Sequence, residues 1–343
     1  MLAQKVIGAT ASAKEQFIAF ASLGAPYVSA YPWSASGFGT KFANPAILPP
    51  STGYSVSFSP SGDAIAVAHN STPYVSAYPW SASGFGTKFS SPATLPPNRG
   101  YGVSFSPSGD AIAVTHSTSP YVSAYPWSAS GFGTKFADPA TLSPTRGYSV
   151  SFSPSGDAIA VAHNSTPYVS AYPWSASGFG VKFANPVILP IGTGYGVDFS
   201  PSGDAIAVAH GTSPFITAYP WSASGFGIKF ANPAILPTGI GYGVDFSSSG
   251  DAIAVAHSNS PFITAYPWSA SGFGTKFANP ATLPASSGRG VAFSPSGDAI
   301  AVSHDGNPFA SAYPWSASGF GTKFTDPVIL PNLAGYGVDF TER

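Results

Sequence analysis

Carboxylates are the side chains of this 343-residue sequence that could most directly support acid–base chemistry. Glycoside hydrolysis, for example, uses two opposed carboxyl groups. The only two glutamates, Glu15 and Glu342, lie near the ends of the sequence, so Asp198 and Asp245, 47 residues apart, are the one candidate pair. No nucleophile elbow, activated serine or phosphate-binding loop accompanies them. We therefore expect no enzymatic activity, with a glycan-active enzyme as a remote alternative.

Histidines are the next candidates for chemistry, as metal ligands. Six of them stand at equivalent places in a repeated unit: His69, His116, His163, His210, His257 and His304. Zinc needs ligands that converge to about 2 Å from one ion, whereas equivalent positions of successive repeats lie on the order of 10 Å apart. The chain also has no cysteine. We expect no metal and no cofactor, and predict that each histidine makes a structural hydrogen bond to the adjoining loop.

A third set of residues could bind a ligand without reacting with it. Six tyrosines and one arginine occupy equivalent positions: Tyr54, Tyr101, Tyr148, Tyr195, Tyr242, Arg289 and Tyr336. Aromatic faces stack on sugars and on apolar side chains. The alternative is that these tyrosines only close the core of each repeat.

The elements that must position these residues recur with a fixed period. The segment SAYPWSASGFGTKF begins at Ser29 and returns almost unchanged six more times. All seven tryptophans are spaced by 47 residues: Trp33, Trp80, Trp127, Trp174, Trp221, Trp268 and Trp315. A period of this length is typical of a repeat architecture in which each unit is one supersecondary element.

Each repeat is predicted to hold four short strands, which residues 53–95 illustrate. GYSVSF alternates large and small side chains and forms strand a, the turn SPSGD follows, and AIAVAH forms strand b. PYVSAYPW is strand c, and GFGTKFANPAIL is an edge strand d, since its lysine and proline discourage further pairing. Four antiparallel strands repeated at this period predict an all-β, seven-bladed β-propeller.

The ends of the sequence predict how the ring closes. Strands a and b each occur seven times, but the chain opens with a strand b, FIAFAS, and closes with a strand a, GYGVDF. One blade must therefore combine residues 17–48 with 336–340, which removes the open edge between first and last repeats. We assign residues 15–343 to a single propeller domain. Residues 1–14 have no counterpart in the repeat and form an extension or docking arm.

Variation between repeats falls on one predicted face. The d–a and b–c connections differ from blade to blade and emerge on the same side of the disc, which we call the connection face; the nearly invariant a–b and c–d turns form the turn face. Variable loops on a fixed scaffold are typical of a binding surface, and neutral drift would look similar. We place Arg99, Arg146, Asp198, Asp245 and Asp305 on the connection face around the tyrosine ring. The channel mouth should then be acidic on one side and basic on the other, unless each charge is merely solvated.

Composition limits the partners. Charged residues are only 8% of the chain and the net charge is −1, which gives no basic field for nucleic acid. No stretch approaches the roughly 18 apolar residues of a membrane span, and the first residues do not read as a secretory signal. We expect a protein or glycan partner, with further assembly through residues 1–14.

Two resemblances refine this expectation. FSPSGDAIAVAH, followed by a strand that ends in tryptophan, resembles the blade of WD-repeat-like propellers, although Ser81 follows Trp80 where that family has aspartate. The segment YPWSASGFGTKFANPA resembles repeats of structural proteins of tailed phages from marine and cyanobacterial hosts. The second resemblance implies a virion component that decorates the capsid or acts in the tail or in adhesion. An intracellular interaction scaffold, located in the cytoplasm, is the alternative that the first implies.

Overall fold

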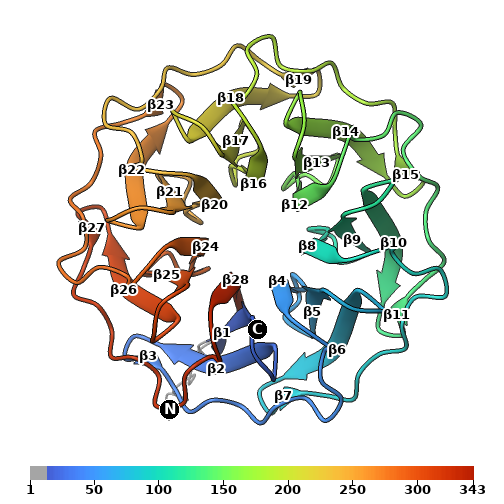
Figure 1. The fold of residues 1–343 in the computed structure, drawn as a ribbon, viewed down its shortest axis with the longest axis horizontal. Coiled ribbons are helices and arrows are strands. Elements are labelled where there is room, and N and C mark those ends of the chain that lie inside the picture. Colours follow the sequence, from blue (N-terminus) through green and yellow to red (C-terminus); the bar gives the residue numbers. More distant parts are fainter. Residues whose placement is uncertain (1–13) are drawn as a thin grey trace, which may run out of the picture.

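The computed structural model describes residues 14–343, which form seven four-stranded antiparallel sheets in a ring around a central channel (Figure 1). This confirms the predicted β-propeller. No helix occurs within residues 14–343. The docking arm was predicted for residues 1–14, of which residues 1–13 lie outside the described part of the chain, so the arm remains a prediction.

Each blade runs from the channel outward in the order a, b, c, d. The innermost strands are β4 (Gly53–Phe58), β8 (Gly100–Phe105), β12 (Gly147–Phe152), β16 (Gly194–Phe199), β20 (Gly241–Phe246), β24 (Gly288–Phe293) and β28 (Gly335–Glu342). The second strands are β1 (Gln16–Ser22), β5 (Ala64–His69), β9 (Ala111–His116), β13 (Ala158–His163), β17 (Ala205–His210), β21 (Ala252–His257) and β25 (Ala299–His304). The third strands are β2 (Val28–Ser34), β6 (Val75–Ser81), β10 (Val122–Ser128), β14 (Val169–Ser175), β18 (Ile216–Ser222), β22 (Ile263–Ser269) and β26 (Ala310–Ser316). The outermost strands are β3 (Gly37–Phe38), β7 (Gly84–Phe85), β11 (Gly131–Phe132), β15 (Gly178–Phe179), β19 (Gly225–Phe226), β23 (Gly272–Phe273) and β27 (Gly319–Phe320).

The outermost strand is much shorter than the sequence pattern predicts. Only two residues pair as a strand, Gly37 with Ser34 and Phe38 with Trp33 in the closure blade, instead of the predicted twelve. Beyond them the chain keeps single backbone bonds, such as Phe42 N–H to the Ala30 carbonyl at 3.0 Å. The glycines and prolines of this segment disfavour a regular ladder, so it continues as an irregular outer wall.

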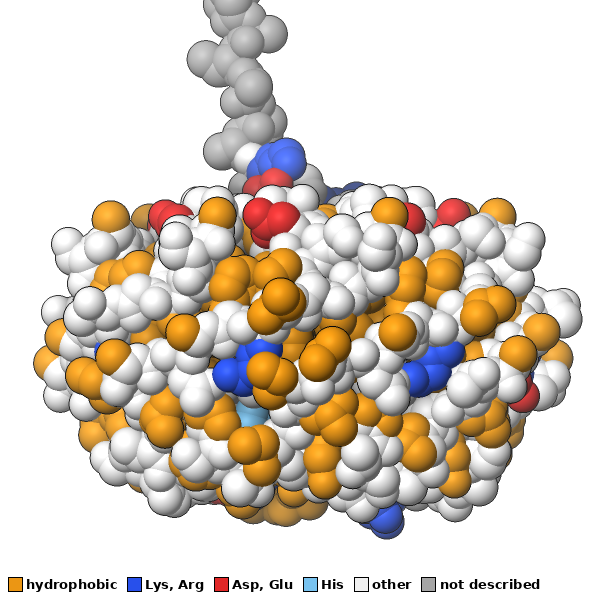
Figure 2. Space-filling view, turned by 90° about the horizontal axis from the view of Figure 1, so that it is seen from above, with side chains coloured by type: hydrophobic (Ala, Val, Ile, Leu, Met, Phe, Trp, Pro, Cys, Tyr) orange, Lys and Arg blue, Asp and Glu red, His pale blue; other side chains and the backbone are white. Residues whose placement is uncertain are grey.

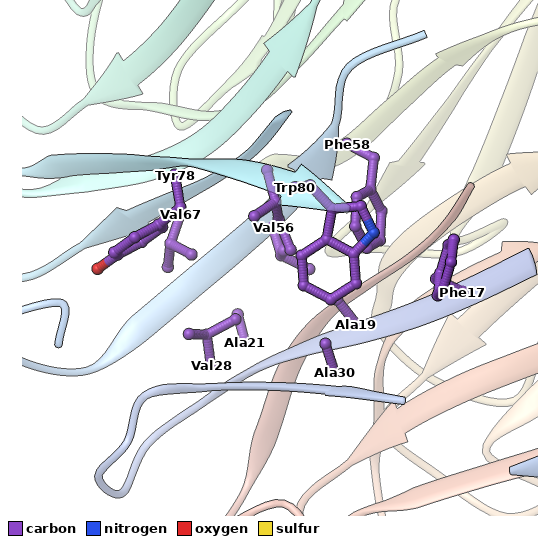
Figure 3. Packing of buried hydrophobic residues seen from close by; sticks show 11 residues of the cluster. Phe17, Ala19, Ala21, Val28, Ala30, Val56, Phe58, Val67, Tyr78 and Trp80 are labelled. Carbon is purple, nitrogen blue, oxygen red and sulfur yellow. The ribbon is translucent and has the colours of Figure 1, made fainter. Parts of the chain in front are cut away.

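The core lies between blades rather than within them. Alternate residues of β1 and β2 face those of β4, β5 and β6, and Figure 3 shows this interface around Trp80. The indole makes edge-on contacts with Phe17, Phe42 and Phe58, with ring centroids 5.1–5.6 Å apart. Equivalent aromatic clusters recur between the other blades, which explains why the whole repeat is so strongly apolar.

The two ends of the domain share one blade, as predicted. Strand β28 pairs antiparallel with β1, in the order β28–β1–β2–β3, with Ile18 opposite Phe340. Backbone bonds of 3.0 Å in both directions between Glu15 and Arg343 extend this pairing. The ring is therefore closed by backbone hydrogen bonds between segments more than 300 residues apart.

Candidate active site in the central channel

A closed belt of aromatic rings surrounds the channel near the connection face. The six predicted tyrosines follow one another around the ring, with neighbouring ring centroids 5.0–5.3 Å apart. Arg289 occupies the seventh place, and its guanidinium carbon lies 4.4 Å from the ring centre of Tyr242 and 5.8 Å from that of Tyr336. The structure thus brings all seven predicted ring residues together as one surface.

Small residues allow the inner strands to come this close. A Cβ at Gly196 would lie 2.9 Å from the Tyr242 carbonyl oxygen and 3.2 Å from the Cα of Gly243, which leaves no room for a side chain. Behind the belt lies a cavity of about 290 Å³, lined by the tyrosines, by small residues and by valines such as Val244 and Val338. This volume is at the lower end of small-molecule sites, so it suits a small ligand.

Arg289 is held by a carboxylate. Asp305, on the connection between β25 and β26, accepts hydrogen bonds from Arg289 Nε at 2.9 Å and from Nη2 at 2.6 Å. This two-point contact fixes the plane of the guanidinium and neutralises its charge. Arg289 therefore continues the belt as a flat, positioned group.

Arg99 and Arg146 stand at the same mouth, on the opposite arc. Each donates a hydrogen bond of 3.2 Å to the hydroxyl of its own blade's tyrosine, Tyr101 or Tyr148. Both guanidinium carbons also lie within 6 Å of the Tyr101 ring centre, at 5.8 and 5.3 Å. The basic arc predicted for the mouth is therefore present.

The acidic arc predicted for the mouth does not form there. Asp198, Asp245 and Asp339 stand three residues after the belt positions, toward the turn face, each directly after a valine of the channel wall. A strand advances about 3.3 Å per residue, so the carboxyl groups lie roughly 10 Å deeper than the tyrosines. Asp198 and Asp245, which were predicted to lie at the mouth, are thus on the expected strands but deeper in the channel than predicted.

Each aspartate reaches into the next blade. Asp198 accepts the Phe246 N–H at 3.2 Å, Asp245 accepts that of Phe293 at 2.7 Å, and Asp339 accepts that of Phe58 at 2.8 Å. These bonds bring Asp198 beside Asp245, since Phe246 is the residue that follows Asp245.

Asp198 and Asp245 lie on neighbouring inner strands, and their carboxyl groups are close enough to influence each other's pKa. Burial raises the pKa of Asp198 to about 6. Burial and the negative charge of Asp198 together raise the pKa of Asp245 well above its ordinary value. Two interacting carboxyl groups of this kind ionise in two separate steps, so the pair holds one proton between those steps. Burial also raises the pKa of Asp339, to about 7.

The fold itself does not require these carboxylates. Four blades with the same inner-strand geometry carry Ser57, Ser104, Ser151 or Ala292 at this position. Ser151 also donates a 3.2 Å hydrogen bond to Asp198 Oδ1 from the neighbouring blade. Three half-buried acids on the inner strands of the channel are thus an addition to the repeat, of the kind that marks functional sites.

The histidines have a structural role. The Nε2 atom of each lies within hydrogen-bond distance of a serine or threonine hydroxyl on the third strand of its own blade, as His69 does with Ser76 at 2.9 Å. The predicted structural bond is therefore made mainly to that strand, and His116 adds a contact from Nδ1 to the Thr118 carbonyl of the adjoining loop. Within residues 14–343 no group of three or more metal-ligating side chains converges.

The two faces of the disc differ in charge. The connection face carries Arg99, Arg146, Arg289 and Asp305. The turn face carries the six aspartates of the a–b turns: Asp63, Asp110, Asp157, Asp204, Asp251 and Asp298. Figure 2 shows red acidic atoms along one rim, with some blue basic atoms among them, and further blue atoms around the waist and at the opposite rim. An anion approaching the channel is therefore favoured at the mouth and disfavoured at the other end.

One residue of the site was missed from the sequence, although Asp198 and Asp245 were recognised there as the one candidate carboxyl pair. Ser151 lies one repeat before Asp198, so the same 47-residue spacing could have identified it as a neighbour of that aspartate.

Within residues 14–343 the structure contains no helix that is long and apolar enough to cross a membrane.

Comparisons with known proteins place the architecture among solved propellers. No family model matches the sequence, and no curated protein matches it. The periplasmic gluconolactonase of Pseudomonas aeruginosa superposes with a TM-score of 0.72 at 16% identity, covering 96% of this chain and 99% of that one. A proposed 6-phosphogluconolactonase from Bacteroides fragilis gives 0.75 at 11% identity with the same coverage, and one from Bacteroides uniformis gives 0.70 at 13% identity, covering 95% and 99%. At these identities the likeness shows the fold alone.

These comparisons correct the expected function. The prediction of a non-enzymatic phage structural protein is contradicted, since the structures that share this architecture over almost the whole chain include a gluconolactonase and two proposed 6-phosphogluconolactonases. The WD-repeat and phage resemblances, and the virion location derived from the latter, find no support in the names of these structures. The sequence offers Asp198 and Asp245 as a candidate pair, but it does not show that the packing of neighbouring blades raises their pKa values.

Proposed function

We propose that this chain is a hydrolase that opens small sugar lactones in its central channel. The observation that carries the proposal is the Asp198–Asp245 pair, two half-buried carboxyl groups on neighbouring inner strands whose pKa values are raised by burial. The names of the superposed gluconolactonase and of the proposed 6-phosphogluconolactonases support the choice of substrate class.

The tyrosine belt and the cavity behind it would receive the sugar. Tyrosine rings stack on the apolar faces of sugar rings, and their hydroxyl groups can exchange hydrogen bonds with sugar hydroxyls. We thus retain the connection face as the binding side, now as the entrance for a substrate. The lining of the cavity ends at valines such as Val244. The ester carbon of the lactone would point past them toward Asp198 and Asp245, which follow Val197 and Val244 in the sequence.

The pair supplies both proton transfers that the reaction needs. The ionised Asp198 carboxylate takes a proton from water as the water oxygen bonds to the lactone carbonyl carbon. The tetrahedral adduct then expels the ring oxygen, which receives the proton of Asp245 as the carbon–oxygen bond breaks. The product is an open-chain hydroxy acid, whose carboxyl group releases one proton to solvent. The pair still holds one proton, which passes from Asp198 back to Asp245 and restores the starting state. Ser151 holds the Asp198 carboxylate by its hydrogen bond to Oδ1.

Hydrolysis of glucono-1,5-lactone, followed by pH-stat titration at pH 6.5 with the buffer rate subtracted, tests the proposal. The variants D198S and D245S place in this position the residue that three other blades already carry, so they should fold. We expect each to reduce kcat at least about 100-fold. D138N, which alters an exposed aspartate paired with Lys135 on the waist of the disc, should retain wild-type activity.

Two results would overturn the proposal. One is a wild-type rate no greater than that of buffer across a panel of five- and six-membered sugar lactones. The other is hydrolysis that persists unchanged in both aspartate variants while they remain folded.

A further inference from the structure

We infer that Arg99 and Arg146 form an anion site at the channel mouth that holds a phosphate or carboxylate group of the bound ligand. The inference rests on the proposed function only for the sugar-like remainder of that ligand. It narrows the substrate class from neutral lactones to those that carry an anionic substituent.

The first support is the shared geometry of the two arginines. Their guanidinium groups flank one ring, that of Tyr101, and each is tied to a tyrosine hydroxyl by a single donor atom. A guanidinium has five N–H donors, so each arginine keeps four beyond this bond. Two planar guanidinium groups near the same aromatic ring can offer several donors to the acceptor oxygens of a phosphate or carboxylate.

The second support is the absence of a protein carboxylate partner. Within residues 14–343 no aspartate or glutamate lies within 4 Å of either guanidinium. Arg289 provides the internal contrast, because Asp305 binds it at two points in the same mouth. Two like charges on one arc repel each other when empty, and an anion between them removes that cost.

The third support is the charge gradient along the channel. The three channel aspartates and the turn-face aspartates lie beyond the belt, so an anionic group is repelled from the deep end. A ligand with one charged end would therefore bind with that end at the arginines and its uncharged end inward. This orientation brings the lactone ester to Asp198 and Asp245.

The site can be tested by isothermal titration calorimetry at low ionic strength with non-lactone ligands. Inorganic phosphate, gluconate, 6-phosphogluconate and neutral glucose are the four probes. We expect 6-phosphogluconate to bind the wild-type protein more tightly than glucose does. The double variant R99Q/R146Q should weaken that binding on the order of 100-fold, about tenfold per lost charge-assisted contact. K182Q is the control, since it removes a positive charge on the waist of the disc, where Lys182 donates a hydrogen bond to Asn185. It should leave the affinity for 6-phosphogluconate within about twofold of the wild-type value.

Comparison of the separate titrations identifies the chemical group that the site recognises. Binding of inorganic phosphate without gluconate assigns the site to phosphate, and binding of gluconate assigns it to carboxylate. The inference is overturned if none of the three anions binds more tightly than glucose, or if R99Q/R146Q binds them as the wild type does. Both arginines are on exposed connections, so folding should be preserved; if the double variant melts early, the single variants R99Q and R146Q give the same test.

The anion site and the proposed lactonase activity can be tested independently of each other. The calorimetry uses ligands that cannot be hydrolysed, so it can establish the anion site in a protein without lactonase activity. Conversely, hydrolysis of glucono-1,5-lactone without any anion binding would support the enzyme and remove the site.

Discussion

Replacing Asp339 with serine should stabilise the protein, and more so at high pH than at low pH. Burial raises the pKa of Asp339 to about 7, from about 3.9 in an unfolded chain. The folded state thus binds this proton more tightly than the unfolded state, and the stability that it contributes is full below pH 4 and is lost as pH rises to 7. At about 1.36 kcal/mol per pKa unit, Asp339 lowers the free energy of unfolding by roughly 4 kcal/mol at pH 8 and by about 1.5 kcal/mol at pH 5. Both values are relative to low pH, where Asp339 is protonated in the folded and the unfolded state.

Differential scanning calorimetry of D339S measures this cost. With about 2.1 cal/mol/K of unfolding entropy per residue, 4 kcal/mol corresponds to a rise in Tm of roughly 5 °C at pH 8, and the rise at pH 5 should be about 2 °C. Loss of the hydrogen bond from Phe58 N–H reduces both values by a similar amount. D138N, an exposed control, should change Tm little at either pH. If D339S lowers Tm equally at pH 5 and pH 8, Asp339 is a structural acceptor for Phe58 and our reasoning about the channel acids fails.

The remaining predictions concern acid stability and ring closure. Burial lowers the pKa of each of the six strand-end histidines to about 4, so below pH 6.5 the unfolded chain binds more protons than the folded one and stability falls as pH drops. We expect Tm to fall steeply between pH 6.5 and pH 4.5, with a shallower slope in H163Q; a Tm that stays level over this range would contradict the burial of neutral histidines. Deleting residues 335–343 removes β28 and exposes the inner edge of β1 together with the packing of Phe340, so Tm should drop by more than about 10 °C and the dye ANS should bind. A truncated chain that keeps the wild-type Tm would show that the closure blade does not hold the ring.

The repeat made the fold predictable in unusual detail. Seven tryptophans at constant spacing, with the offset between the first strand b and the last strand a, predicted both the blade number and the closure of β1 with β28. The tyrosine ring was predicted for the same reason, since equivalent positions on inner strands must encircle the axis. Strand d was overestimated because its sequence is apolar enough for a strand, while its glycines and prolines limit pairing to two residues.

The candidate site was predicted only in part. Alternation along a strand indicates which face a residue occupies, and it says little about depth along the channel. Asp198 and Asp245 were therefore assigned to the mouth, although they lie three residues beyond Tyr195 and Tyr242. Their raised pKa values could not be predicted either, because desolvation depends on how closely neighbouring blades pack around the carboxyl groups.

The pH dependence of kcat for sugar lactone hydrolysis, measured from pH 5 to 8.5 on the wild type and on D198S, tests the central claim most directly. We predict that the wild-type rate rises around pH 6, as Asp198 ionises, and declines at higher pH, as Asp245 loses the proton that it donates to the ring oxygen. D198S should lack the rising limb and lose at least about 100-fold in rate at the optimum. A wild-type rate that shows no dependence on pH, or a D198S profile that superposes on that of the wild type, would contradict the assignment of the channel carboxyl pair as the catalytic group.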